Sequence, residues 1–294
     1  MPRILTVLLT VVLGCLAAAC GNPRVNDSGP PANTPDNRPD NRPANNQPTG
    51  PVPWPAISLQ PVYAADARFR TTRTLRVEEL TATERYLTES TEVTLTRVLS
   101  IDERGRLLAL RRDYELSNTR LTKGFGDGEA AAGILQGAIL ELRRRQGVVQ
   151  VKVLAGDSSL ARQNFLMDGF ELALLPLDEV RQGDRWVLDA GALASLNKFI
   201  EAVGYKIEKN KLICVLAAVT ADSAEISLDW QITGEFSGKP AVLGFEGTVV
   251  FDRKQKLVRQ VSITGGRPTG EGARQQIEIG LKRRLTHGWL DLDD

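Results

Sequence analysis

Few residues in this chain of 294 have the types and spacing that catalysis or metal binding requires. The only histidine is His287, so a multi-histidine metal site and a cysteine–histidine zinc cluster are both excluded. A serine nucleophile would depend on that histidine, and no Gly-x-Ser-x-Gly elbow accompanies it. We therefore expect no catalytic residue, no metal site and no cofactor. A hydrolase that uses a pair of carboxylates remains the alternative, because sequence alone does not exclude one.

The N-terminus has the parts of a secretory signal. Arg3 supplies the positive charge, an apolar run extends from Ile4 to Leu16, and small residues precede Cys20. The sixteen residues from Ile4 to Ala19 are fewer than the roughly 20 that cross a bilayer as a helix. Residues 1–19 are therefore predicted to be a signal peptide that is removed.

The segment Leu16–Cys20 resembles the lipobox of bacterial lipoproteins, with Ala17 where a leucine usually stands. Val12–Cys15 is a competing match, but small residues and a following polar segment favour Cys20. The resemblance implies export and a palmitate-type lipid on Cys20 that anchors the chain to a bacterial membrane, with the domain facing the periplasm or the exterior. Gly21 replaces the aspartate of inner-membrane retention, which favours the outer membrane where one exists. Ordinary secretion with an incidental cysteine is the alternative.

Residues 20–56 are predicted to be a lipidated cysteine followed by a disordered tether. Ten of the 15 prolines lie between Gly21 and Ala56, among asparagines and almost no large apolar residues. Such a segment buries too little apolar surface to offset the entropy of ordering. Extended at about 3.1 Å per residue, it would reach roughly 110 Å. Cys214, within the apolar stretch 212–216, is then the one thiol of the exported domain and is expected to be a buried core residue.

Residues 57–294 are predicted to form a single β-rich globular domain. Apolar residues alternate with polar ones over several segments, most clearly at 224–232, and also at 69–77, 87–99, 243–251, 261–263 and 277–281. This period of two is typical of antiparallel sheet with one wet face. The fold class is therefore α+β and mainly β, with a curved antiparallel sheet or half-barrel.

Two or three helices are expected to cover one face of that sheet. Glu129–Gln146 has apolar residues at three- and four-residue spacing, an acidic start, a triple-arginine end and Gly147 as a C-cap. Ser158–Leu172 is a second candidate helix, and Asp189–Val203 is a third.

A faint internal echo links residues 99–108 to residues 249–258. Both segments have an apolar strand, an aspartate, a short charged turn and a second strand. Two ordinary hairpins with the same turn chemistry would give this pattern. The alternative is a domain of two related β halves joined by a helical middle.

One segment resembles a family of uncharacterised bacterial secreted lipoproteins. Leu175-Pro176 and Val180–Trp186 match its "LP…VxxGDxW" segment, and Gly247–Asp252 matches a late "GxxxFD" hairpin. The family has no established activity. Its layout is similar to the half-barrels of periplasmic lipoprotein carriers, which hold acyl chains in a concave face. At the level of residues, Gly183-Asp184 suits a turn and Trp186 suits the core.

Charge gives no sign of a nucleic-acid partner, because 37 lysines and arginines balance 36 acids. The predicted partners are the membrane, through the lipid on Cys20, and a lipid or an envelope protein. The sequence thus favours a non-catalytic binding or structural domain at the cell envelope that shelters an apolar or acyl ligand, with no ligand-binding residue identified. The carboxylate-based hydrolase is the alternative.

Overall fold

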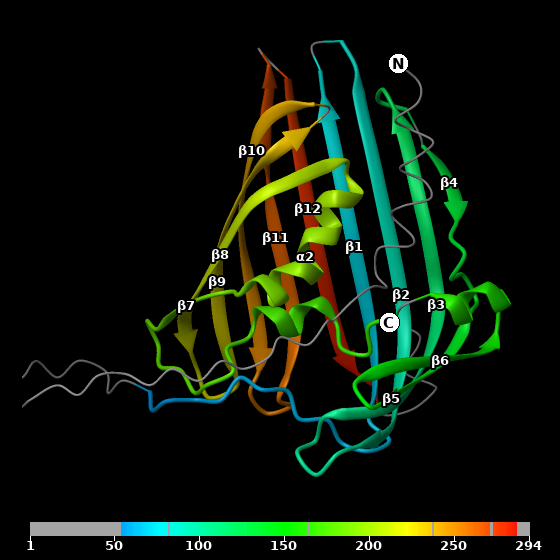
Figure 1. Ribbon diagram of the computed structural model, residues 1–294, viewed down its shortest axis with the longest axis vertical. Coiled ribbons are helices and arrows are strands. Elements are labelled where there is room, and N and C mark those ends of the chain that lie inside the picture. The colour runs from blue at the N-terminus through cyan, green and yellow to red at the C-terminus, as the bar shows by residue number, and fades with distance from the viewer. Residues whose placement is uncertain are drawn as a thin grey trace, which may run out of the picture.

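The computed structural model describes residues 54–286, apart from residues 82, 127, 164, 237 and 271–272. This part of the chain is mainly β, as predicted: it forms one open antiparallel sheet with a single α-helix, α2 (Ala190–Ala202) (Figure 1). The predicted signal peptide, Cys20, all of the tether except its last three residues, and His287 lie outside the described residues.

The sheet has the strand order β6-β5-β3-β2-β1-β12-β11-β10-β9-β8-β7, and β4 pairs with β3 away from this path. Strands β1, β2, β3, β5 and β6 form one meander, and strands β7 to β12 form a second. The two meanders meet where β1 pairs with β12. The strands are β1 (Arg68–Leu80), β2 (Arg85–Ile101), β3 (Leu107–Lys123), β4 (Glu129–Ala132), β5 (Ile139–Arg145), β6 (Val148–Ala155), β7 (Arg185–Val187), β8 (Tyr205–Val219), β9 (Ser223–Phe236), β10 (Lys239–Asp252), β11 (Leu257–Gly270) and β12 (Ala273–Leu285).

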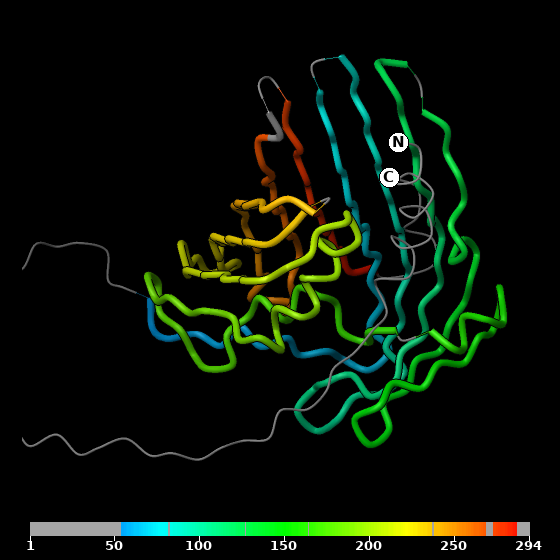
Figure 2. Tube along the Cα trace, turned by 45° about the horizontal axis from the view of Figure 1, so that its top comes forward, coloured from blue at the N-terminus to red at the C-terminus, as the bar shows by residue number. Residues whose placement is uncertain are grey.

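The sheet is curved, and α2 lies on its concave side between the two ends (Figures 1 and 2). Two short 3-10 helices, η1 (Ser158–Arg162) and η2 (Phe170–Leu174), belong to the connection between β6 and β7. Contacts of η2 with α2 and β11 place it on this side of the sheet. Because α2 and η2 cover only part of the concave face, the rest of that face can form a hollow.

The concave face of β8–β12 is the main hydrophobic core. The alternation that predicted β9 is confirmed, since Ala224, Ile226, Leu228, Trp230 and Ile232 are all buried. Trp230 packs on Phe245 with ring centroids 5.0 Å apart, and its indole nitrogen donates to Asn210. Cys214 is fully buried in the same core and unpaired, as expected. A second, smaller core lies over β2, β3 and β5.

The prediction of a helix over Glu129–Gln146 is wrong. The segment forms β4, a turn, and β5, in which Leu140 and Leu142 are buried at a spacing of two. Gln146 (φ 50°) and Gly147 (φ 81°) form the two-residue loop of the β5–β6 hairpin rather than a helix end. Two consecutive positive φ angles are what a tight hairpin demands, and glycine satisfies one without strain.

The prediction of two or three covering helices is also wrong, because α2 is the one α-helix among the described residues. Ser158–Leu172 contains η1 and the start of η2 instead of a continuous helix. The third predicted helix is confirmed: it begins after Asp189, whose carboxylate accepts from the amide of Ala192 at 2.8 Å as an N-cap. The helices in the described residues are all too short or too polar to cross a membrane.

The two segments of the internal echo are both hairpin turns. The Asp102 carboxylate accepts from the amides of Arg104 and Arg106 between β2 and β3. The Asp252 carboxylate accepts from the amides of Lys254 and Gln255 between β10 and β11. The two segments therefore share the same turn chemistry.

Candidate functional site

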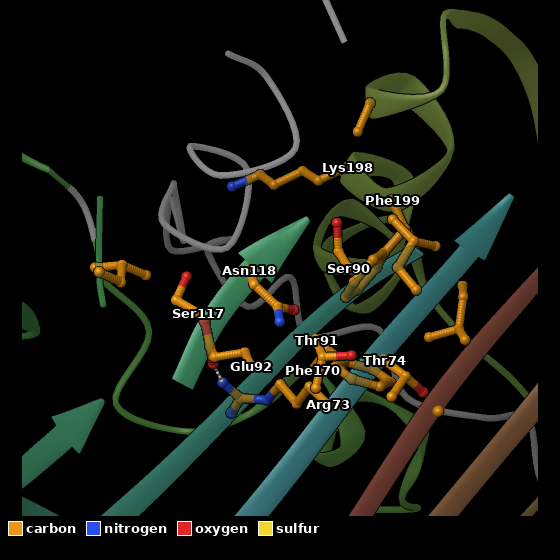
Figure 3. Close-up of a pocket in the computed structure, with 15 residues that line it drawn as sticks. Arg73, Thr74, Ser90, Thr91, Glu92, Ser117, Asn118, Phe170, Lys198 and Phe199 are labelled. Carbon is orange, nitrogen blue, oxygen red and sulfur yellow. Dashed lines mark hydrogen bonds and ion pairs between the residues drawn. The ribbon is translucent and has the colours of Figure 1, made fainter. Parts of the chain in front are cut away.

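Three adjoining hollows lie on the concave face beside α2, and together we call them the concave hollow. The inner pocket is walled by Leu75, Phe170 and Phe199 and floored by Arg73 and Glu92 (Figure 3). It shares Arg73, Glu92, Phe170 and Phe199 with a second hollow, the charged passage. About 60 Å³ of the pocket and 20 Å³ of the passage can take the centre of a water molecule, enough for a few waters.

The third part, the outer groove, is larger and open to solvent. It lies between the β5–β6 hairpin and the start of α2, and it shares Phe165, Leu166 and Asp168 with the charged passage. Its volume is about 670 Å³, which falls within the range of about 300–1,000 Å³ typical of small-molecule sites. Its apolar walls include Val149, Leu172 and Ala192. The groove is therefore large enough for an apolar ligand.

Arg73 and Glu92 form an ion pair at the floor of the hollow. They stand opposite each other on β1 and β2, and Arg73 Nη1 lies 2.8 Å from Glu92 Oε1. Burial alone would lower the pKa of Arg73, but the Glu92 carboxylate raises it above its ordinary value. The side chains are only 12% and 10% exposed, so the pair is held in a largely desolvated environment.

A second ion pair, between Glu171 of η2 and Arg283 of β12, is completely enclosed. Arg283 Nη2 donates to Glu171 Oε1 at 2.5 Å, and the other donors of Arg283 reach Thr71 Oγ1 and the Val258 carbonyl. The guanidinium also lies 5.0 Å from the ring centre of Phe69. Burial would raise the pKa of Glu171, but Arg283 and then Arg73 hold that pKa below its usual range. Glu171 therefore stays ionised and joins η2 to the sheet.

Arg112 of β3 is also buried in the hollow, and among the described residues it forms no ion pair with a carboxylate. Its Nη1 and Nη2 donate to the carbonyl oxygens of Leu166 and Met167 at 3.3 and 3.2 Å, while its Nε is buried without a partner. It lines the charged passage beside Tyr114, whose pKa burial raises. Arg112 thus fastens the 165–169 segment over the sheet with a guanidinium that is only partly satisfied.

The acids of the hollow are all engaged in ion pairs. Glu92 pairs with Arg73, Glu171 with Arg283, and Asp168 with Arg144. A general acid needs a carboxyl whose environment favours the protonated form, and Arg283 favours the ionised form of Glu171 instead. Within the described residues, no three His, Cys, Asp or Glu side chains gather as metal ligands. The hollow thus combines paired acids with apolar walls.

The residues that the sequence singled out are not in the hollow. Gly183 (φ 93°) and Asp184 form a turn, in which the Asp184 carboxylate accepts from the amide of Arg181. Trp186 lies in β7, packs against the main core and donates to the Leu174 carbonyl. Burial raises the pKa of the Cys214 thiol to about 12, which makes it a poor nucleophile. Cys20 and His287 lie outside the described residues.

The cluster of Arg73, Glu92, Arg112, Glu171 and Arg283 was not predicted, although one signal for it is in the sequence. Arg73 stands on the same face as Phe69, Leu75 and Val77, and a charge within an apolar face marks a buried polar site. Glu171 gives no such signal because η2 has no regular pattern.

Comparison with known proteins gives little further guidance. No protein-family model and no curated protein matches the chain. Among solved structures, a chain from a study of lipid–protein interactions in lipovitellin is similar to 76% of this chain at 7% identity, with a TM-score of 0.40. This chain spans about a quarter of the length of that one.

Proposed function

We propose that this protein is a non-catalytic, membrane-anchored envelope lipoprotein whose concave hollow receives an apolar or acyl ligand. The anchor is the lipid on Cys20, attached after export of the chain. The outer membrane is the expected location where the cell has one. The partners are thus the membrane and a lipid, and a protein of the envelope is the alternative occupant of the hollow.

The observation that carries the proposal is the outer groove. It offers about 670 Å³ between mostly apolar walls, and it shares lining residues with the charged passage, which in turn shares Phe170 and Phe199 with the inner pocket. Mostly apolar walls with a few converging polar groups are the usual composition of a small-molecule site. The pairing of the acids in the hollow supports binding over the hydrolase alternative.

Native mass spectrometry of the full chain purified from its own host tests the proposal. We expect a population with added mass that organic extraction removes and identifies as lipid. Consistently ligand-free protein would refute the lipid-binding function and leave binding of an envelope protein.

A matched pair of substitutions connects that ligand to the groove. Ala192 lines the groove in the first turn of α2, whereas Ala190, also in that turn, is exposed and is not part of the wall. Ala192→Phe should fill the groove and reduce the bound fraction, and Ala190→Phe should leave it unchanged. Equal loss in both variants, or in neither, would place the ligand elsewhere.

A further inference from the structure

Resting on the proposed function, we propose that the ligand has an anionic head, a carboxylate or a phosphate on an acyl chain, and that Arg112 and Arg73 bind this head in the charged passage. The acyl chain then lies in the outer groove. The charged passage is then the polar end of the hollow, and the ligand belongs to the class of acyl compounds with an anionic head.

The charged side chains around the passage do not balance. The cluster contains three arginines, Arg73, Arg112 and Arg283, against two glutamates, Glu92 and Glu171. The neighbouring pair of Asp168 and Arg144 is neutral as a unit and leaves this balance unchanged. Among these five residues one positive charge is thus in excess, in a place where isolated charges are costly. An anion from the ligand would neutralise it.

Arg112 is a buried arginine whose hydrogen-bond donors are only partly used. The residue is 6% exposed, and its hydrogen bonds go to two neutral carbonyl oxygens. Its Nε and that of Arg73 are both buried without a hydrogen-bond partner in the part of the chain that the structure describes, and both arginines line the same passage. Arginine is the residue best suited to carboxylate and phosphate oxygens, because its planar group presents several donors in fixed directions. These two guanidiniums line one hollow, and they are the groups to which we assign the anionic head.

A ligand in the outer groove would lie next to the charged passage. The passage and the groove share Phe165, Leu166, Asp168, Gly169 and Ser195, so they adjoin over the 165–169 segment. An amphipathic ligand that enters the groove can therefore bring its head to Arg112 while its chain remains against apolar walls. A purely structural role for Arg112, that of fastening the 165–169 segment, predicts no dependence on the charge of the ligand.

The experiment compares ligands that share one chain and differ in their head. The full chain with Cys20→Ser, which lacks the predicted lipidation site, is loaded with the neutral fluorescent probe N-phenyl-1-naphthylamine. Oleate, oleyl phosphate and oleyl alcohol then compete with the probe. We expect at least one of the two anions to displace the probe at a concentration at least about tenfold lower than oleyl alcohol, which corresponds to about 1.4 kcal/mol. A preference for one anion identifies the head as carboxylate or phosphate.

Substitutions at neighbouring positions assign that preference to the passage. Arg112→Gln should remove the advantage of the anions while leaving the affinity for oleyl alcohol unchanged, and Arg112→Lys should keep most of it. The matched control is Arg111→Gln, because Arg111 is the adjacent residue on β3, is 39% exposed, and pairs with Asp113. If Arg112→Gln does not fold, the wild-type ligand series still tests the anionic head, because equal displacement by all three ligands would overturn it.

The outcomes separate the two proposals. Equal displacement by all three ligands, or an anion preference that survives Arg112→Gln, would overturn the anionic head and leave an apolar binding site. Failure of the probe and all three ligands to bind would overturn the proposed function as well.

Discussion

The buried pair of Glu171 and Arg283 gives the sharpest test of how the concave side is held together. Glu171→Gln keeps the size of the side chain and removes its charge, so Arg283 is left as a buried cation without its counter-ion. Arg283 is 4% exposed and Glu171 is 0% exposed, so water cannot compensate. Breaking a buried pair from one side typically costs about 3–5 kcal/mol.

The lower end of that range is expected here. Arg283 would keep its hydrogen bonds to Thr71 and the Val258 carbonyl and its position over the ring of Phe69. A loss of about 3 kcal/mol lowers the melting temperature of a domain of this size by about 6–12 °C. Thermal unfolding followed by circular dichroism measures it. Glu89→Gln is the matched control, because Glu89 is 41% exposed and pairs with Arg76 at 3.7 Å, so its loss should be small.

The pH dependence adds a second criterion. Because the pKa of folded Glu171 lies below its ordinary value of 4.5, the ion pair stabilises the fold fully above pH 4.5. That stabilisation is lost as the pH falls through the folded pKa. The difference in melting temperature between wild type and Glu171→Gln should therefore narrow below pH 4.5. A difference that is absent at pH 7, or that stays constant on acidification, would refute the reasoning.

Three further predictions concern separate parts of the chain. Gly169→Ala should destabilise the fold, since an added Cβ would lie 1.9 Å from Oε2 of Glu171 and would displace that carboxylate. The control Gly126→Ala, which has open space around it, should leave the free energy of urea unfolding unchanged. Burial raises the pKa of Tyr63 from 10.0 to about 12, so wild type should lose about 2 kcal/mol of stability between pH 10 and 12 that Tyr63→Phe does not lose. Metabolic labelling with a palmitate analogue should mark wild type and not Cys20→Ala; an unlabelled wild type would contradict the anchor.

Local patterns in the sequence predicted those elements whose residues are close together in the chain. The alternation at 224–232 predicted β9, and Asp189 before an apolar repeat predicted the start of α2. The segment 129–146 shows where such reasoning fails. Its apolar residues fit a helical spacing as well as a β-hairpin, and pairing of β5 with β3 and β6 decided between them.

The charged cluster of the hollow could not be predicted from local sequence patterns either. Its members come from β1, β2, β3, η2 and β12, as far apart in the chain as Arg73 and Arg283. No local pattern relates them, because they meet only when β12 pairs with β1 and η2 packs on the concave face.

The sequence by itself thus determined the mainly β class, the burial of Cys214 and the position of α2, although it predicted further helices that the structure lacks among the described residues. Periodicity and capping are local properties of the chain. Only the tertiary structure decided where the sheet curves, which part of its concave face stays open, and how three arginines and two glutamates come to share one buried site. Those features arise from contacts between residues distant in the chain. An alternating pattern in the sequence predicts that a side chain is buried, but it does not predict which other side chains it contacts.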